Sequence, residues 1–176
     1  MTLFAIPTRR GASPATLAGT LLLLAALAAS LSAASLQDDV SRRRRDYDNQ
    51  RNAVGKAKKV PKLGDAQFAA ARAAMRASQY DEALRILTEY RDIVFTTRDL
   101  LLAEVPNPEK KSGGFKQMEI HVRKSLESMA DIISDAPVMQ REAFEAIRND
   151  LDRVNKLLIK DLFPRQPGRT ATGKQP

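Results

Sequence analysis

Apolar residues between Phe115 and Leu162 recur in two runs at intervals of three, four and seven positions. The first run consists of Phe115, Met118, Val122, Met129 and Ile133, and the second of Phe144, Ile147, Leu151, Val154, Leu158 and Leu162. A helix with this spacing carries one apolar stripe and one charged face, whereas a half-buried strand alternates at every second residue. Each run therefore predicts an amphipathic helix.

The four residues between the two runs indicate how the helices connect. Asp135 is a candidate N-cap for the second helix, and Pro137 stands where the first turn of a helix tolerates proline. We therefore expect helices over Phe115 to Ser134 and Ala136 to Leu162, folded back on each other as a hairpin.

Two further helices are predicted before this hairpin. The proline-containing segment Val60 to Gly64 is expected to interrupt the helical course of the chain. An alanine-rich helix capped by its first residue is then expected from Asp65 to Ser78, and a longer one from Tyr80 to Glu104, which ends at Val105-Pro106-Asn107-Pro108. These patterns predict an all-α protein, an antiparallel helical bundle made of helical hairpins.

A thin apolar stripe of Leu36, Val40, Tyr47 and Val54 predicts one more helix, from Ser35 to about Lys59. This helix is highly charged. Three pairs of opposite charge are spaced four residues apart along it, so that they would face one another: Asp38 with Arg42, Asp39 with Arg43, and Arg44 with Asp48.

The basic charge of the chain is concentrated in this region. The formal net charge is +8, and residues 36–62 hold nine basic residues against four aspartates. A local excess of this kind favours a solvated helix face with ion pairs over a nucleic-acid-binding surface. The alternative interpretation is attraction to anionic lipid headgroups, a wall polymer or nucleic acid.

Residues 1–34 have the pattern of an export signal. Arg9 and Arg10 precede an apolar core from Leu17 to Ala29, and Ser32-Ala33-Ala34 offers a cleavage site before Ser35. The alternative is an uncleaved membrane anchor over residues 17–34, which is near the lower bound for spanning a bilayer. The cluster from Arg42 to Arg45 conflicts with simple export, because positive charges close after an apolar core resist translocation.

The sequence thus divides into four parts. These are a signal peptide or anchor at 1–34, a charged basic helix and linker at 35–62, a helical bundle at 63–163 and a disordered tail at 164–176. The tail is expected to stay disordered because it has too few apolar residues to form a core. The chain has no cysteine, which excludes disulfides, a thiolate nucleophile and a lipid-modified cysteine.

Phe68, Ala71, Tyr80, Ala83 and Leu87 resemble part of a tetratricopeptide repeat over about thirty residues. Ser78 stands where that family usually has glycine, and Phe95 where it has the closing proline. The resemblance implies a single helix-turn-helix and a surface for a peptide or protein partner. The chain as a whole, with its leader and alanine-rich hairpin, is also similar to uncharacterised exported helical proteins of bacteria, a resemblance that implies no activity.

Residues that could carry catalysis or bind a metal are few. His121 is the only histidine, and Glu119 lies two positions away, whereas a metal pair on a helix needs a spacing of three or four. The segment Lys110 to Gly114 lacks the spacing of a phosphate-binding loop. We therefore expect no catalytic residue, no metal and no cofactor, and a half-buried structural role for His121.

The leading hypothesis is an exported, non-enzymatic interaction or scaffold protein of the bacterial cell envelope, either periplasmic or secreted, or anchored through residues 17–34. Its partner would be a protein or peptide, and its expected contact residues are Arg42, Arg43, Arg44, Arg45, Tyr80, Tyr90 and Arg91. The runner-up is an anionic-lipid or nucleic-acid binder that uses the basic segment 42–62. Because apolar stripes can pair helices between chains as well as within one, a homo-oligomer is left open. An enzyme with His121 as its base ranks third.

Overall fold

Five helices follow one another along residues 35–164, which are the residues that the computed structural model describes, and these residues contain no strand. They are an N-terminal helix at residues 35–48, then α2 (Ala53–Arg76), α3 (Tyr80–Glu104), α4 (Gly113–Asp135) and α5 (Val138–Leu162). The expectation of an all-α helical bundle is confirmed. The expected signal sequence, its cleavage site and the tail after Pro164 lie outside the described residues.

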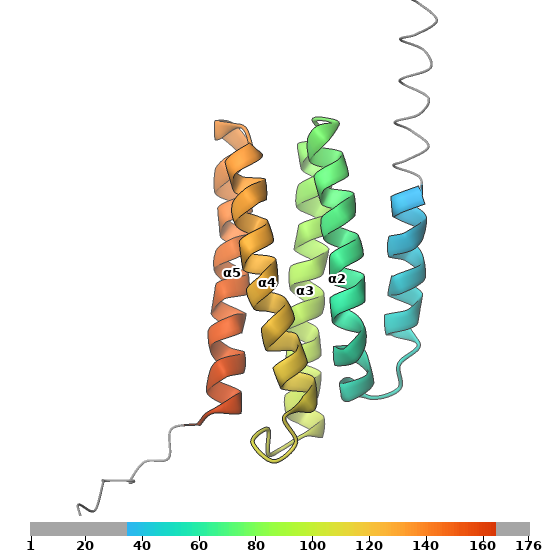
Figure 1. Ribbon diagram of the computed structural model, residues 1–176, viewed down its shortest axis with the longest axis vertical. Helices are drawn as coiled ribbons and strands as arrows, with labels where there is room; N and C mark the ends of the chain where they lie inside the picture. The colour runs from blue at the N-terminus through green and yellow to red at the C-terminus, as the bar shows by residue number, and fades with distance from the viewer. Residues whose placement is uncertain (1–34, 165–176) are drawn as a thin grey trace, which may run out of the picture.

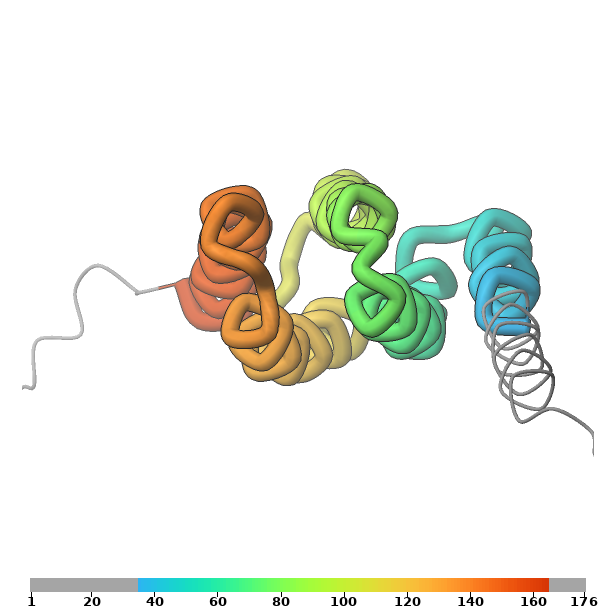
Figure 2. Tube along the Cα trace, turned by 90° about the horizontal axis from the view of Figure 1, so that it is seen from above, coloured from blue at the N-terminus to red at the C-terminus, as the bar shows by residue number. Residues whose placement is uncertain are grey.

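The helices form two hairpins that stand side by side. The turns that join α2 to α3 and α4 to α5 lie at the same end of the molecule, called here the upper end (Figure 1). Helix α2 packs against α4, and α3 packs against α5. Seen along the helix axes, α2 and α4 form one layer, while α3, α5 and the N-terminal helix form the other (Figure 2).

The hairpin of α4 and α5 confirms the prediction made from the two apolar runs. All six apolar residues named for the second run are buried, and the large aromatic rings of Phe115 and Phe144 are fully enclosed. The prediction that Asp135 caps the second helix was wrong, because Asp135 is the last residue of α4. Pro137 is itself the N-cap residue, and its carbonyl accepts hydrogen bonds from the backbone N–H groups of Gln140 and Arg141.

Helix α2 runs through the segment that was expected to break it. Pro61 lies inside this helix, and Asp65, which was expected to cap a new helix, lies exposed in its middle. A proline removes a single N–H donor from the helix, while Val60 and Leu63 on either side of it are fully buried. Burial of such apolar residues, each worth about 2 kcal/mol, outweighs the local preference for a break.

The chain breaks earlier instead, at residues 49–52. The N-terminal helix ends at residue 48, and α2 begins at Ala53 with the Asn52 side chain accepting a hydrogen bond from the backbone N–H of Gly55 at 2.6 Å. The predicted continuous helix from Ser35 to Lys59 was therefore wrong, and residue 62, the expected end of the linker, lies inside α2. Two antiparallel helices now share the basic residues, and the N-terminal helix folds back beside α2 and α3 (Figure 1).

The turn between α2 and α3 has a left-handed residue. Ser78 has a φ of 57°, and the backbone N–H of Gln79 donates to the Ala74 carbonyl at 2.9 Å. The Ser78 N–H donates to the Met75 carbonyl at 3.0 Å. This pair of bonds is the Schellman motif, which usually has glycine at the left-handed position.

Within residues 35–164, no helix is both long and apolar enough to cross a bilayer.

Candidate functional site

A hollow of about 420 Å³ opens between the N-terminal helix and α3, beside the start of α2. We call it the N-terminal groove. Its lining residues are Arg44, Tyr47, Asp48, Lys56, Glu89, Asp92, Ile93, Thr96 and Leu100. The lining therefore combines both signs of charge with an aromatic ring and two aliphatic side chains.

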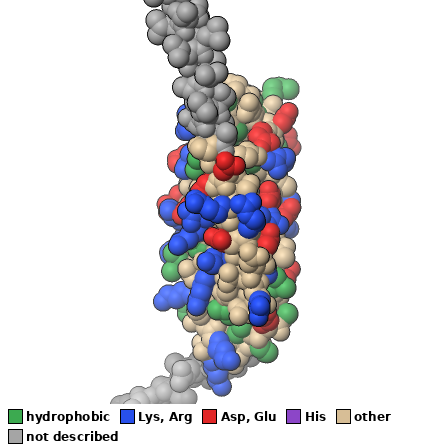
Figure 3. Space-filling view, turned by 90° about the vertical axis from the view of Figure 1, so that its right-hand side faces the viewer, with side chains coloured by type: hydrophobic (Ala, Val, Ile, Leu, Met, Phe, Trp, Pro, Cys, Tyr) green, Lys and Arg blue, Asp and Glu red, His purple; other side chains and the backbone are tan. Residues whose placement is uncertain are grey.

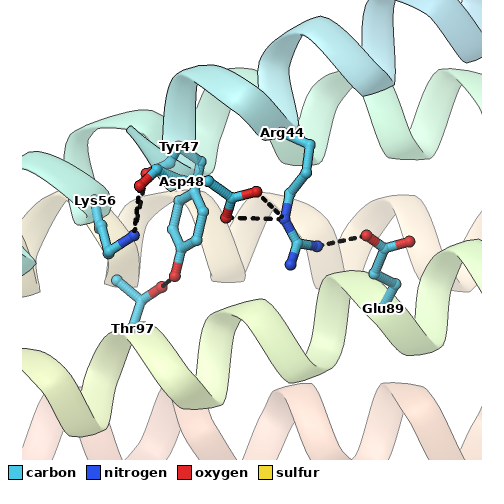
Figure 4. A network of polar contacts seen from close by, with 6 residues as sticks. All are labelled: Arg44, Tyr47, Asp48, Lys56, Glu89 and Thr97. Atoms are coloured by element: carbon cyan, nitrogen blue, oxygen red, sulfur yellow. Dashed lines mark hydrogen bonds and ion pairs between the residues drawn. The ribbon is translucent and has the colours of Figure 1, made fainter. Parts of the chain in front are cut away.

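Arg44 links the two helices that border the groove. Its Nε atom lies 3.1 Å from both carboxylate oxygens of Asp48, one turn away on the same helix, and its Nη1 atom lies 2.6 Å from Glu89 on α3 (Figure 4). The side chains of Arg44 and Glu89 are 39% and 36% exposed. An ion pair with that much solvent access contributes about 0–1 kcal/mol to stability. The main effect of the two bonds is to fix the guanidinium in place.

Tyr47 anchors the N-terminal helix in the core. Its hydroxyl lies 2.8 Å from the Thr97 hydroxyl, and both residues are buried. Because Thr97 donates its own proton to the Ile93 carbonyl at 2.6 Å, Tyr47 is the donor in this bond. The helix is therefore attached to α3 through a buried hydrogen bond as well as through the Arg44 pair.

Lys56 closes the lower end of the groove. Its ammonium donates to the Tyr47 carbonyl at 3.2 Å and lies 4.5 Å from the centre of the Tyr47 ring. The same carbonyl also accepts a hydrogen bond from the backbone N–H of Gln50 at 3.1 Å, and a cation is favourable here because the C-terminus of a helix carries partial negative charge. The start of α2 is fixed as well, because the Ala53 N–H donates to Glu104 of α3 at 2.8 Å. The groove is thus a preformed surface with donors, acceptors and apolar area in set positions.

The basic residues of segment 42–62 that do not line the groove fall into two groups. Arg42 and Arg43 both pair with Asp39, and the hydrogen bond from Arg42 lowers the pKa of the Asp39 carboxyl. In a second group the side chains make no hydrogen bond or ion pair within residues 35–164, and we call it the free-cation surface: Arg45, Arg51, Lys58, Lys59 and Lys62. Figure 3 shows Lys and Arg side chains forming a belt across the face that carries the N-terminal helix.

Tyr90 lies in the core, whereas Arg91 is partly exposed and engaged in ion pairs. Tyr90 is fully buried and its hydroxyl bonds to the Ser125 hydroxyl at 2.7 Å, so its expected role in partner binding was wrong. The reason is that Tyr90 belongs to the apolar stripe of α3, where its ring packs edge-on against Phe68 at 5.2 Å between centres. Arg91 instead bridges the hairpins, with its Nη1 atom 3.2 Å from Asp150 of α5.

Tyr80 is partly exposed at the upper end. It borders a second hollow of about 610 Å³, which lies between the turns of the two hairpins. The other lining residues are Ser78, Gln79, Asp81, Glu82 and Gln140. Arg44 and Tyr80, two of the expected contact residues, therefore lie in different hollows, Arg44 in the N-terminal groove and Tyr80 at the upper end of the molecule.

His121 is buried between α2 and α4 and is more enclosed than the sequence suggested. Its ring packs edge-on against Tyr90 at 5.8 Å, and its Nε2 atom has no hydrogen-bond partner. Burial lowers the pKa of His121 to about 4, so the imidazole is neutral at pH 7. Among residues 35–164, no three carboxylate or imidazole side chains are grouped so as to hold a metal ion.

Sequence reasoning missed several lining residues of the N-terminal groove. Glu89 in the lining and Thr97, which is buried behind it as the partner of Tyr47, face residues that precede them by 45 and 50 positions, and local spacing cannot show such a contact. One signal was present, because Thr97 falls on the apolar stripe of α3 one turn after Ile93, where a polar residue needs a buried partner.

Comparison of the chain with protein-family models, with curated proteins and with solved structures gave no match.

Proposed function

We propose that this protein is a non-enzymatic interaction scaffold of the bacterial cell envelope, and that a segment of a protein partner docks in the N-terminal groove. The observation that carries this proposal is the groove itself. It presents charged groups of both signs beside the apolar side chains of Ile93 and Leu100. Interfaces between proteins combine an apolar centre with polar groups around it in this way.

The bonds around the groove favour recognition over loose contact. Arg44 is held on two sides by Asp48 and Glu89, so that little side-chain freedom is lost when a partner binds. Asp92 and Thr96 are exposed along the same hollow. Asp92 pairs with the neighbouring Arg91 at 2.8 Å, but its side chain is 61% exposed and can still contact an incoming chain. An amphipathic segment with an aliphatic side chain and flanking charges matches this set of groups.

The envelope location rests on the export pattern of residues 1–34, and the partner-binding role is in keeping with the tetratricopeptide-like residues of α2 and α3. Four of those five residues, Phe68, Ala71, Ala83 and Leu87, are buried where the two helices pack. The two hairpins also stand side by side in two layers (Figure 2). Stacked hairpins of this kind offer extended surfaces for partners.

The test is site-directed crosslinking in the native host. A photo-crosslinking amino acid at Thr96, inside the groove, is expected to trap one partner, while the same amino acid at Asn149, exposed on α5, is not. Binding of the purified partner is then measured to the Thr96→Arg and Asn149→Arg variants. We expect Thr96→Arg to weaken the Kd at least tenfold, about 1.4 kcal/mol, and Asn149→Arg to leave it unchanged. Equal weakening by both, or by neither, would sink the proposal.

A second candidate function rests on the free-cation surface. Its five basic side chains have no partner among residues 35–164, so each can contact an anionic lipid headgroup or a nucleic-acid phosphate without first breaking an ion pair. In this version the protein is held at a membrane, with residues 17–34 as its anchor. Each basic side chain near an anionic bilayer adds about 1 kcal/mol of attraction.

Binding to vesicles and to duplex DNA separates this second candidate from the first. Replacement of Arg45, Arg51, Lys58 and Lys62 by Gln is expected to abolish binding to vesicles with anionic lipid. Replacement of Arg76, Lys110, Lys111 and Lys116 by Gln removes the same charge elsewhere and is the matched control. If binding to vesicles and to DNA does not depend on salt, or if the two Gln variants lose it equally, a specific role for the free-cation surface is excluded.

A further inference from the structure

Helix α5 leaves apolar side chains exposed at both of its ends. At the upper end Val138 is 78% exposed and Met139 is 92% exposed. At the other end, the lower end in Figure 1, Phe163 is 73% exposed and Ile159 is 42% exposed. These four are among the six large hydrophobic residues that the described part of the chain exposes. Their position at the two ends of a single helix is what calls for an explanation.

The lower patch combines its apolar side chains with cations. A hollow of about 540 Å³ is lined by Lys156, Ile159, Lys160, Phe163 and Pro164. Residues four apart share one side of a helix, which places Ile159 beside Phe163 and Lys156 beside Lys160. Lys156 pairs with Asp152 at 2.6 Å, but the lysine is 72% exposed and can exchange that partner at little cost.

The upper patch combines its apolar side chains with acidic groups. Val138 and Met139 open α5, and Glu142 follows within the next turn, exposed on the same helix. Asp135, also exposed, ends α4 immediately before the turn. The upper patch therefore consists of Asp135, Val138, Met139 and Glu142, and its charge is opposite to that of the lower patch.

The whole molecule repeats this polarity along its long axis. The upper halves of the helices, residues 35–41, 67–91 and 125–149, contain ten acidic and six basic residues, a net charge of −4. The lower halves, residues 42–66, 92–124 and 150–164, contain 18 basic and 11 acidic residues, a net charge of +7. Two copies in the same orientation attract each other end to end, because opposite charges then meet.

We infer that the protein associates with itself head to tail, the upper patch of one copy docking on the lower patch of the next. Val138 and Met139 of one copy cover Ile159 and Phe163 of its neighbour, while acidic and basic side chains meet at the rim. A contact between two different patches is heterologous, so each added copy leaves one patch free, and the result is a chain or a ring. This surface is separate from the N-terminal groove and goes beyond the partner binding proposed above.

The test uses protein isolated from cells that express the full chain, and two variants that each block one patch. Val138→Gln with Met139→Gln blocks the upper patch, and Ile159→Gln with Phe163→Gln blocks the lower one. Glutamine is neutral, so neither variant creates a new charge attraction. Circular dichroism confirms that each variant remains helical, and sedimentation velocity then gives the weight-average mass from 5 to 500 µM.

We expect the weight-average mass of the unaltered protein to rise above twice the protomer mass as its concentration increases, and to decrease in high salt. Each variant alone is expected to stay at the protomer mass. An equal mixture of the two is expected to reach twice that mass and to stop there, because each variant retains one intact patch. Three results would each overturn the inference: an unaltered protein that stays at the protomer mass, a variant that still dimerises alone by pairing like patches, or a mixture that does not associate.

Discussion

Gly64 of α2 lies against His121 of α4 so closely that a Cβ atom at position 64 would stand 2.3 Å from the imidazole Nε2. This Cβ atom would also stand 2.7 Å from a ring carbon of Tyr90. Both neighbours are ring atoms of buried side chains, which cannot swing away as the end of a flexible chain does. The approach of the two hairpins therefore depends on the missing side chain at this position.

The substitution Gly64→Ala is expected to destabilise the fold. An alanine in the interior of a helix normally gains about 1 kcal/mol over glycine. Overpacking a filled core costs about 1–3 kcal/mol, and two ring contacts under 3 Å place this site at the upper end of that range. We expect a net loss of about 2 kcal/mol, measured as the free energy of unfolding in urea.

Gly113 provides the matched control. It begins α4, and a Cβ atom there would meet nothing within 4 Å. Gly113→Ala is therefore expected to leave stability unchanged or to raise it by up to about 1 kcal/mol. If Gly64→Ala gave the same small gain, the close approach of Gly64 to His121 would not be what limits this position.

Stability is expected to fall with acidification because of His121. Burial holds the pKa of its imidazole at about 4 in the folded protein, against about 6.5 in the unfolded chain. As pH drops through 6.5 the unfolded state takes up a proton that the folded state refuses. The free energy of unfolding therefore decreases by about 3 kcal/mol between pH 6.5 and pH 4. Above pH 7 the protonation of His121 no longer affects it.

The charged groups around His121 oppose each other. Asp65 on α2 raises its pKa and Lys124 on α4 lowers it, and these two side chains are themselves 3.5 Å apart. The measurement is urea unfolding at pH 7.5, 6 and 5 for the unaltered protein and for His121→Gln. The variant is expected to lose about 2 kcal/mol less between pH 7.5 and 5. Parallel pH profiles would show that His121 is already able to accept a proton in the folded state.

Local sequence signals predicted the helices where tertiary packing agreed with them. The bounds of α3 match the expectation from Tyr80 to Glu104 because start and stop signals stand directly beside the apolar stripe. Pro61 led to the wrong prediction of a helix break. The free energy that a proline costs a helix can be judged from the local sequence, whereas the burial of Val60 and Leu63 depends on contacts with other helices. The break at residues 49–52 was missed because the contact between Tyr47 and Thr97 that fixes the N-terminal helix joins residues 50 positions apart.

The candidate site was less predictable than the fold. Arg44 was expected to contact a partner, and it does line the N-terminal groove, but Glu89 opposite it could not be found from spacing on one helix. Tyr90 was expected to contact a partner because it belongs to the tetratricopeptide-like hairpin, for which the resemblance implied a partner surface. Its neighbours one turn away on the stripe, Ile86 and Val94, were the signal that it would be buried.

The left-handed turn residue offers a stabilising substitution. Ser78 has a φ of 57°, a conformation that costs an L-residue with a side chain about 1 kcal/mol and costs glycine almost nothing. Ser78→Gly is therefore expected to raise the free energy of unfolding by about 1 kcal/mol, measured by urea or thermal unfolding. Ala77→Gly is the control, because Ala77 has a φ of −85° and glycine there only adds freedom to the unfolded chain. A loss in both variants would count against strain at Ser78.

The last prediction concerns the ion pair between Arg98 of α3 and Asp161 of α5. The Arg98 Nε atom lies 2.8 Å from the carboxylate, and the two side chains are only 13% and 14% exposed. Removing one partner of an enclosed pair strands the other charge, which costs about 3–5 kcal/mol when burial is complete. With some solvent access remaining, we expect Asp161→Asn and Arg98→Met each to lose about 2 kcal/mol in urea unfolding.

The double variant distinguishes an ion pair from two independent contacts. Arg98→Met combined with Asp161→Asn is expected to lose at least 1 kcal/mol less than the sum of the single losses, since no charge is then left unpaired. The control is Asp152→Asn, which removes the partner of Lys156 from a pair with side chains 72% and 41% exposed. That loss is expected to stay below about 1 kcal/mol. Additive losses at Arg98 and Asp161 would mean that these two side chains do not stabilise the fold as a pair, and that apolar packing and the contact between Arg91 and Asp150 hold α3 against α5.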